Sequence, residues 1–519
     1  MIHPVVLRIN GKKQETAAET GILLSELIRQ NQIALPMPCA GNHTCGKCKV
    51  KASGALSPMT AQERAFLSER EIASGVRLAC FAAVEGACEL AVDTGDAGSQ
   101  IQSSAVFAEF PIDPPVKAGC GLAVDIGTTT VVAYLYDLAD GKLLGVQSGM
   151  NAQRGFGGDV ISRINYSNEH GLEPLQAAII EQIRQQAADA LAACGKSLAD
   201  LRSAVITGNT TMLHLLAGLN PYGIAVSPFT PVSLFGTELS PEILSFPSAR
   251  VYLPRCISSY VGADITCSIL ASDMMEQQTA LLIDLGTNGE MALRYQGRLY
   301  CCSTAAGPAF EGAGMQMGMT AVDGSIHKVW MADGELRYTV LGGGSAAGIC
   351  GSGVIDAVSI FVKAGLIDDT GRIEEEAEGY SRFGTEFDGF PALKIGESGV
   401  LITQQDVRKL QLAKSAIAAG VLTLLSESGC ALEEIETLYL AGGFGSYVDI
   451  HSASGIGLVP KALVPKVKVI GNGAGAGASM LLLSRAAAER EEEIAACAGE
   501  IGLSANPTFM DHYVEQMMF

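Results

Sequence analysis

The stretch Gly-Leu-Ala-Val-Asp-Ile-Gly-Thr-Thr-Thr at residues 121–130 has a counterpart at residues 281–290, Leu-Leu-Ile-Asp-Leu-Gly-Thr-Asn-Gly-Glu. In each, an apolar run typical of a β-strand ends in aspartate, a glycine-threonine turn follows, and a second strand leaves the turn. Glycine lets backbone N–H groups approach an anion, threonine hydroxyls add donors, and aspartate can hold a hydrated divalent cation. Each stretch therefore predicts a turn that binds phosphate and a metal ion.

The similarity between the two halves continues beyond these turns. Each turn is followed by a further strand, a long helix, a strand that runs into a polar or glycine-rich segment, and a glycine-led helix start. We expect these features at residues 143–147, 174–193, 203–211 and 260–264 in the first half, and at 298–302, 404–428, 441–445 and 469–475 in the second. A repeat of this length predicts two duplicated lobes.

The order of these elements resembles the superfamily of actin, heat-shock chaperones and sugar kinases, over roughly residues 119–485. The resemblance implies duplicated α/β lobes of ribonuclease-H-like fold that hold ATP and Mg²⁺ between them, with Asp125 and Asp284 orienting the hydrated metal. The alternative is that the second turn is only a structural echo. The implied nucleotide contacts are Gly127, Thr128, Thr129, Thr130, Gly286, Thr287 and Asn288 at the phosphates, Gly442, Gly443 and Phe444 at the adenosine, and Gly473 and Gly475 closing the pocket.

A dense group of cysteines lies near the start of the chain. Cys39, Cys45 and Cys48 form a C-x5-C-x2-C loop, and Cys80 follows after 31 intervening residues. Three thiolates on one loop and one from a distant strand suit a 2Fe-2S cluster. Zinc is the alternative, but zinc knuckles usually show two C-x2-C pairs and this region has one. The remaining thiol of the region, Cys88, is expected in the core.

Residues 1 to about 95 resemble the ferredoxins of the adrenodoxin-like branch, whose cluster loop is also one residue longer than the plant-type spacing. The resemblance implies an α+β domain of β-grasp fold, in which we expect a strand at 2–10 and a helix at 20–30. Residues 96–117 carry a Gly-, Ser-, Gln- and Pro-rich composition typical of a linker, either a flexible tether or a loop packed on the surface. The first lobe is then expected at 118–275 and the second at 276–519, with an insertion at 304–400.

Composition and charge limit the partners. The chain has 519 residues, 48% of them hydrophobic, and a net charge of −20, which opposes binding to nucleic acid or anionic membranes. It shows no secretory signal and no apolar run of about 18 residues, so we expect a cytoplasmic location. Two further glycine-rich segments are candidate contacts: residues 151–160 to a partner or nucleotide, and residues 351–353, which open a helix, to nucleotide.

A one-electron carrier and a nucleotide clamp on one chain suit an electron transfer that is uphill on average and is driven by a change of conformation. Nearly the whole chain resembles the reductive activators of corrinoid proteins, through motifs at residues 208–212, 284–290, 306–312, 348–353 and 441–445. The resemblance implies a protein that takes an electron from a reductase and returns cob(II)alamin on a corrinoid methyl carrier to cob(I)alamin. The donor must be external, because the chain shows no flavin or nicotinamide fingerprint.

Three other functions stay open at this stage. A small-molecule kinase would need a positioned general base, and no carboxylate outside the two turns is marked as one. An activator of another low-potential enzyme, such as a radical dehydratase, is a close mechanistic neighbour. A redox-sensing, ATP-dependent binding module is the alternative that is not an enzyme. A homodimer is also left open.

Overall fold

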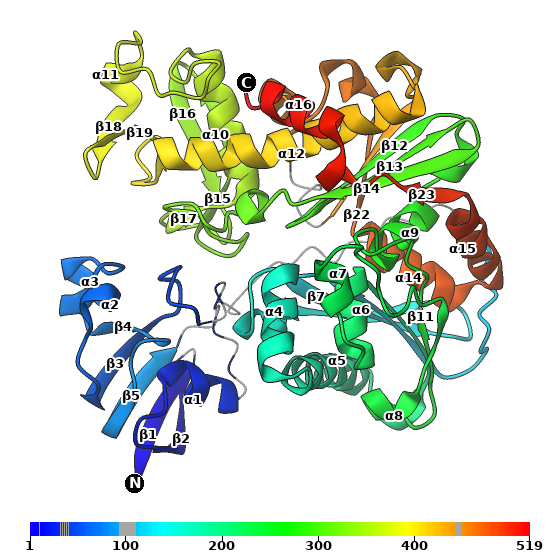
Figure 1. The fold of residues 1–519 in the computed structure, drawn as a ribbon, viewed down its shortest axis with the longest axis horizontal. Helices are drawn as coiled ribbons and strands as arrows, with labels where there is room; N and C mark the ends of the chain where they lie inside the picture. Colours follow the sequence, from blue (N-terminus) through cyan, green and yellow to red (C-terminus); the bar gives the residue numbers. More distant parts are fainter. Residues whose placement is uncertain are drawn as a thin grey trace.

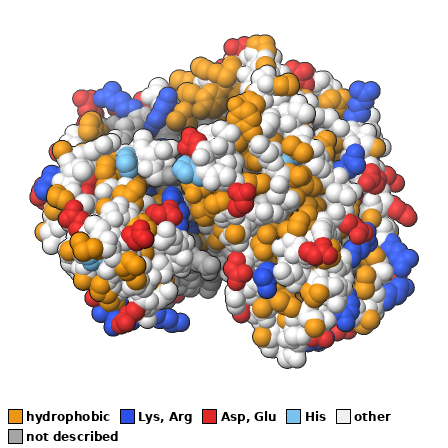
Figure 2. Space-filling model, turned by 60° about the horizontal axis from the view of Figure 1, so that its bottom comes forward, with side chains coloured by type: hydrophobic (Ala, Val, Ile, Leu, Met, Phe, Trp, Pro, Cys, Tyr) orange, Lys and Arg blue, Asp and Glu red, His pale blue; other side chains and the backbone are white. Residues whose placement is uncertain are grey.

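The computed structural model describes residues 1–9, 11–31, 33, 35, 37, 39, 41–92, 110–442 and 448–519. Three main sheets account for its shape, one in an N-terminal head and one in each of two larger lobes (Figure 1). The head stands beside the larger body, and a hollow separates the two on the face shown in Figure 2. Within the described residues, no helix is both long and apolar enough to cross a membrane.

The head is a five-stranded β-grasp sheet with the order β2-β1-β5-β3-β4, in which β1 and β5 run parallel. Its core is formed by apolar side chains such as Leu7, Leu27 and Leu90, all buried. The helix expected at residues 20–30 begins only at Leu24, because the amide of Thr20 still donates to the carbonyl of Met1 in the β-hairpin. The elements are β1 (Ile2–Ile9), β2 (Lys12–Glu19), α1 (Leu24–Gln30), β3 (Lys49–Leu56), α2 (Ala61–Arg64), α3 (Glu69–Ala73), β4 (Val76–Leu78) and β5 (Val84–Val92).

The first lobe is a six-stranded sheet with the order β10-β11-β9-β6-β7-β8. The strand that was expected to run into Gly-Asn-Thr-Thr within residues 203–211 ends at Gly208, where the side chain of Asn209 accepts a hydrogen bond from the amide of Met212 and caps α6. The strands are β6 (Cys120–Ile126), β7 (Thr130–Asp137), β8 (Leu143–Met150), β9 (Leu201–Gly208), β10 (Thr237–Leu239) and β11 (Arg250–Leu253). The helices are α4 (Val160–His170), α5 (Glu173–Ala193), α6 (Thr210–Ala217), α7 (Tyr222–Ala225), α8 (Pro241–Leu244) and α9 (Ala263–Ala271).

The second lobe repeats this plan with the order β22-β21-β12-β13-β14-β23. In both lobes the first strand pairs antiparallel with the next one along the chain and parallel with the strand that follows the long helix. The predicted duplication is therefore confirmed. The strands are β12 (Ala280–Leu285), β13 (Gly289–Tyr295), β14 (Arg298–Thr304), β21 (Thr437–Ala441), β22 (Val467–Gly471) and β23 (Ala498–Glu500), and the helices are α12 (Gln404–Ser428), α13 (Ile450–Gly455), α14 (Gly473–Leu483), α15 (Arg485–Cys497) and α16 (Pro507–Glu515).

Helices α9 and α14 lie against each other where the two lobes meet (Figure 1). They share one core with residues of both sheets, including Tyr134 of the first lobe and Tyr439 of the second. The contact is close because α14 carries glycines on this side: a Cβ on Gly477 would lie 2.1 Å from the carbonyl oxygen of Cys267. The two glycine-threonine turns are thereby held on facing edges of one continuous core.

The insertion at residues 304–400 packs on the core of the second lobe. Phe310, Ile326 and Phe361 of the insertion are buried together with residues of α12 such as Ile417. The insertion contains two small sheets, β16-β15-β17 and β18-β19-β20. Its elements are β15 (Ser325–Ala332), β16 (Glu335–Val340), β17 (Gly348–Ile349), α10 (Gly351–Lys363), α11 (Tyr380–Phe383), β18 (Gly384–Phe387) and β19 (Phe390–Lys394), and β20 (Leu401–Thr403) follows directly.

Two segments for which the sequence predicts no regular structure also pack on the lobes: the end of the expected linker and the C-terminal segment. In the described end of the expected linker, the amide of Asp113 donates to Leu483 at the end of α14, 2.9 Å away. The C-terminal segment lies along α12, where the side chain of Gln411 donates to the carbonyl of Met517 at 2.8 Å. Residues 110–117 are therefore a packed connection, whereas residues 96–109 lie outside the described chain.

Candidate iron-sulfur and nucleotide sites

The four predicted cysteine ligands come together at one end of the head as two pairs. The sulfur atoms of Cys39 and Cys45 lie 3.3 Å apart, and those of Cys48 and Cys80 also lie 3.3 Å apart. Cys48 stands just before β3 and Cys80 just after β4, and the amide of Ala79 donates to the Cys48 carbonyl at 2.8 Å. The antiparallel pairing of β3 with β4 thus brings a cysteine from each end of the motif to the same place.

A buried ion pair holds the strand that delivers Cys80. Glu63 is fully buried and accepts two hydrogen bonds from Arg77, at 2.8 and 2.9 Å, and one from the amide of Leu78 at 2.9 Å. On the other side, the ring of His43 stacks on Phe81, and its Nε2 atom lies 2.9 Å from the carbonyl oxygen of Cys80. His43 therefore contacts the backbone of this segment.

The donor set fits a 2Fe-2S cluster. In such a cluster each iron is held by two cysteine thiolates, and the structure supplies two pairs. The hydrogen bond between the two side chains lowers the pKa of the Cys48 thiol and raises that of Cys80. Cys88 is buried in β5, and its burial raises the pKa of its thiol.

The second site is a cavity of about 240 Å³ between the two lobes. Both predicted turns face it. The predicted residues that line it are Asp125, Gly127, Thr128, Thr129, Thr130, Asp284, Gly286, Thr287, Asn288 and Gly442. Gly351 and Ser352 at the start of α10 line it as well, as the glycine-rich segment there suggested.

The threonines of the two turns contact each other across the cavity. The hydroxyl groups of Thr129 and Thr287 lie 3.1 Å apart, and Thr287 also donates to Glu311 of the insertion at 2.7 Å. Glycine is required at position 127, because a Cβ there would lie 2.9 Å from the Thr130 carbonyl oxygen. The hydroxyls that are expected to bind phosphate are thus already directed into the space between the lobes.

Four carboxylates surround this space. Asp125 and Asp284 are the last residues but one of the equivalent strands β6 and β12. Asp264 lies in the first turn of α9, and Glu290 lies in β13. Glu290 is buried, whereas the three aspartates keep part of their surface open to the cavity. The sequence analysis did not assign Asp264 or Glu290 a role, although each stands in a motif that it identified. Each is an acidic residue one or two positions after a glycine, Glu290 after Gly289 and Asp264 after Gly262, and this was the signal that could have found them.

Burial raises the pKa of all four carboxylates, and the charge of neighbouring carboxylates adds to the shift at Asp125, Asp284 and Glu290. Burial, and then the charge of Asp264, raises the pKa of Asp125 to about 7, and burial with Asp264 and Asp125 raises that of Asp284 to about 8. Burial also raises the pKa of Asp264, to about 6, and that of Glu290 well above its usual value. Among the described residues that line the cavity, none is Lys, Arg or His. Carboxylate oxygens without a cationic partner fit a hard divalent cation such as Mg²⁺.

Two predicted glycines lie behind the cavity wall. Asn472 and Ala474 line the cavity, whereas Gly473 and Gly475 between and after them face the protein interior. A Cβ on Gly473 would lie 2.9 Å from the Ser268 hydroxyl, and one on Gly475 would lie 2.6 Å from the ring of Tyr134. These glycines serve helix packing in this structure, and their contact with nucleotide stays a prediction. Gly443 and Phe444 lie outside the described residues.

Comparisons with known proteins were made for the whole chain. Residues 7–85 match the family described as the 2Fe-2S iron-sulfur cluster binding domain. Residues 120–277 match the RACo middle region, and residues 278–519 match the C-terminal domain of RACo, the ASKHA domain.

Individual relatives match over much of the chain. The chain is 37% identical to the corrinoid activation enzyme RamQ of Eubacterium limosum, over 81% of this chain and 73% of that protein. It is 27% identical to the [Co(II) methylated amine-specific corrinoid protein] reductase of Methanosarcina barkeri, over 77% of each chain. A solved structure, the reductive activator for corrinoid, iron-sulfur protein, superposes with a TM-score of 0.72 at 30% identity and covers 100% of this chain and 98% of its own.

Proposed function

The chain belongs to the family of reductive activators of corrinoid proteins, and from this premise we propose that it restores an inactivated corrinoid protein of a methyltransferase system. One electron passes from the 2Fe-2S cluster of the head to cob(II)alamin on the partner, which becomes cob(I)alamin. The cluster is oxidised by one electron in the same step, and an external reductase returns it to the reduced state. ATP binding or hydrolysis in the cleft between the lobes makes the transfer feasible.

The observation that carries this proposal is the presence of two complete donor sets on one chain. The head brings four thiols together as two pairs, and the lobes bring two phosphate-binding turns and four carboxylates together around one cavity. A ferredoxin alone has no use for the second site, and a kinase of the same superfamily has no use for the first. An ATP-dependent electron transfer uses both.

The head residues have one task in this function. When bound, a 2Fe-2S cluster accepts and gives up a single electron. Cys39, Cys45, Cys48 and Cys80 would hold it, and the buried Glu63–Arg77 pair would keep Cys80 in place while the head docks on different partners.

The cleft residues have a second task. Asp125 and Asp284 would hold the hydrated Mg²⁺, and Thr128, Thr129, Thr130, Thr287 and Asn288 would bind the phosphates. A gap of about 150 mV between cluster and cobalt corresponds to roughly 3.5 kcal/mol, at about 59 mV per tenfold for one electron. A nucleotide that binds one arrangement of the lobes a few hundredfold more tightly than another supplies a free energy of this size.

The partners are a corrinoid protein and an electron-donating reductase, both reached in the cytoplasm. The net charge of −20 supports protein partners over nucleic acid or anionic membranes. A homodimer remains compatible with the proposal.

The test is an anaerobic assay with chemically reduced protein and a cob(II)alamin-loaded methyl carrier, followed by the absorbance of cob(I)alamin. We expect reduction with ATP and Mg²⁺ and a stall without nucleotide. Reduction at the same rate and to the same extent without nucleotide, or no reduction with ATP across a panel of carriers, would reject the proposal. The redox-sensing binding module would then be the better interpretation.

A further inference from the structure

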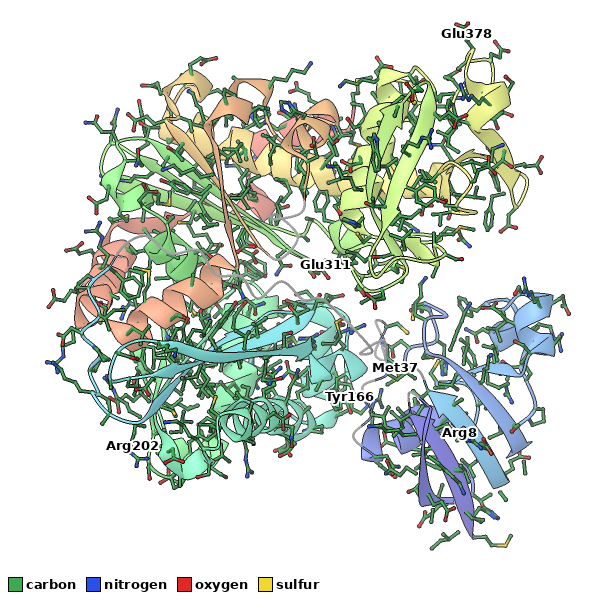
Figure 3. The ribbon with its side chains drawn as sticks, turned by 180° about the vertical axis from the view of Figure 1, so that it is seen from behind. Arg8, Met37, Tyr166, Arg202, Glu311 and Glu378 are labelled. Atoms are coloured by element: carbon green, nitrogen blue, oxygen red, sulfur yellow. The ribbon has the colours of Figure 1, made fainter. Side chains whose placement is uncertain are left out.

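One loop of the first lobe joins the iron-sulfur head to the phosphate-binding turn. The loop comprises residues 151–157 and contains the short 3-10 helix η1 (Ala152–Gly155), directly after β8. The side chain of Arg29 in α1 donates from Nε to the carbonyl of Gly155 at 3.1 Å, and the amide of Met37 donates to the carbonyl of Arg154 at 3.3 Å. Figure 3 shows Met37 beside Tyr166 where the head meets the lobe.

This contact is specific and lies next to the cluster loop. The guanidinium of Arg29 lies 5.8 Å from the ring centre of Phe156 and 5.6 Å from that of Tyr166, so it contacts both an aromatic pair and a carbonyl. Met37 is 1% exposed and stands two residues before the cluster ligand Cys39. A movement of the loop would therefore move Met37, and with it the segment that carries Cys39, the first cluster ligand.

The other end of the loop is bonded to the phosphate-binding turn. Asn151, which is fully buried, donates from its amide to the carbonyl of Thr129 at 2.8 Å and from its side chain to the carbonyl of Gly127 at 2.7 Å. The amide of Arg154 donates back to the carbonyl of Asn151 at 3.0 Å. Asn151 is therefore bonded both to the turn and to Arg154, and the carbonyl of Arg154 accepts the hydrogen bond from the head.

A buried arginine makes a second connection between the same two segments. Arg163 in α4 is fully buried and donates from Nη2 to the carbonyl of Thr128 at 2.5 Å and from Nε to the carbonyl of Gly157 at 3.1 Å. Burying a cation is costly unless it is well bonded, and burial lowers the pKa of this guanidinium to about 9. Its planar fork reaches both carbonyls at once, which a lysine could not do.

We propose that Asn151 and Arg163 are positioning residues that couple nucleotide binding at residues 127–130 to the docking of the iron-sulfur head through Arg29. The proposal rests on the function proposed above and adds its regulation: the nucleotide sets whether the head stays on the first lobe or leaves it to reach the corrinoid partner. Asn151 and Arg163 donate hydrogen bonds to the carbonyls of the turn at residues 127–130. Arg29 keeps its hydrogen bond to Gly155 only while the loop at residues 151–157 stays in place.

The contacts in the cleft give the direction of this coupling. In the docked arrangement the hydroxyls of Thr129 and Thr287 are bonded to each other. A phosphate that accepts a hydrogen bond from each hydroxyl would replace this contact and separate the two turns, and we expect the Thr128 and Thr129 carbonyls to move with the first turn. Nucleotide binding therefore weakens the docking of the head. By thermodynamic reciprocity, loss of the docking contact strengthens nucleotide binding by the same factor.

The test compares full-length Arg29→Ala with Arg8→Ala, both with the cluster intact by absorbance. Arg8 lies in β1 of the same head, is exposed and pairs with Glu89 on β5. The affinity for a non-hydrolysable ATP analogue with Mg²⁺ is measured by calorimetry. We expect binding about fivefold tighter for Arg29→Ala, at the lower end of typical coupling factors, and no change for Arg8→Ala.

Two further measurements separate coupling from a merely structural contact. Hydrogen exchange of residues 24–31 and 151–166 should rise when the nucleotide analogue binds the wild-type protein, and residues 151–166 should lose this response in Arg163→Lys. In the Arg163→Lys background, Arg29→Ala should no longer change nucleotide affinity, which is the outcome a double-mutant cycle requires of a connected path.

The outcomes also separate this inference from the proposed function. If wild-type protein binds the nucleotide and Arg29→Ala binds it equally or more weakly, the coupling is overturned and the reductive function stands. If Arg8→Ala tightens binding as much as Arg29→Ala, the specific path is overturned. If wild-type protein binds no nucleotide at all, the proposed ATP-dependent function fails together with the coupling.

Discussion

The thiol site and the cleft site are built in opposite ways. Three of the four thiols belong to one ten-residue loop, from Cys39 to Cys48, and only Cys80 arrives from elsewhere in the head. The cleft takes Asp125 and Asp264 from one lobe and Asp284 and Glu290 from the other, and the two lobes must pack before these carboxylates meet. The thiol site can therefore form within one small domain, whereas the cleft site exists only when both lobes have packed together.

The largest expected effect is the complete loss of one site without the other. Cys80→Ser removes one of the four thiols, so the visible absorbance and the iron and sulfide content of protein purified without oxygen should be lost. Nucleotide should still bind, because the cleft is formed by other parts of the chain. Cys88→Ser and Cys194→Ser are the matched controls and should keep two irons and two sulfides per chain. One equivalent of zinc and no absorbance in the wild-type protein would contradict the cluster assignment.

The converse experiment breaks the cleft. Asp125→Ala and Asp284→Ala each remove an oxygen ligand expected for Mg²⁺, and we expect ATP hydrolysis to fall by about 10²–10³-fold, the range found for loss of one preorganised electrostatic group. The cluster absorbance should not change. Asp140→Ala, at an exposed turn of the first lobe, is the control. Binding and hydrolysis at wild-type rates in both variants would show that these aspartates do not form the site.

A smaller effect is expected from the ion pair beneath the thiol site. Glu63→Gln leaves the buried Arg77 without a charged partner, which costs about 3–5 kcal/mol in comparable buried pairs. Because the pair lies in the head, the variant should unfold its cluster domain at lower denaturant while the lobes keep their midpoint. Cluster absorbance and tryptophan fluorescence distinguish the two events, since the single tryptophan, Trp330, lies in the second lobe. Coincident transitions would mean that the head and lobes unfold together.

The smallest effect is a pH dependence of the cleft. The pKa values of Asp125 and Asp284 are raised in the folded protein, so their stabilising contribution is full below the unfolded pKa near 4 and is lost as pH rises through about 7 to 8. Without Mg²⁺, the melting temperature of the lobes should fall by about 2 °C or more between pH 5.5 and pH 8.5. Mg²⁺ with nucleotide should reverse the fall at pH 8.5, and an equal fall in Asp125→Ala with Asp284→Ala would contradict this origin.

Much of this protein follows from local sequence pattern. The spacing of Cys39, Cys45 and Cys48 identified the thiol loop, because ligand spacing within one loop is a local property. Asp125 and Asp284 were identifiable because each ends an apolar run before a glycine-threonine turn, and the duplication of the two lobes followed from the repetition of that pattern. Each of these patterns involves residues that are close together in the sequence, so the local conformation of the chain is enough to bring them together.

Only the tertiary structure decided the rest. Asp264 and Glu290 became part of the cleft because α9 and β13 pack at the junction of the lobes, and Gly473 and Gly475 became packing residues because α14 lies close against its neighbours. The contact of Arg29 with the loop at Gly155 joins segments more than a hundred residues apart, on two domains with separate cores. A contact of this kind depends on how two finished surfaces meet, and no periodicity, turn or spacing within either segment specifies that.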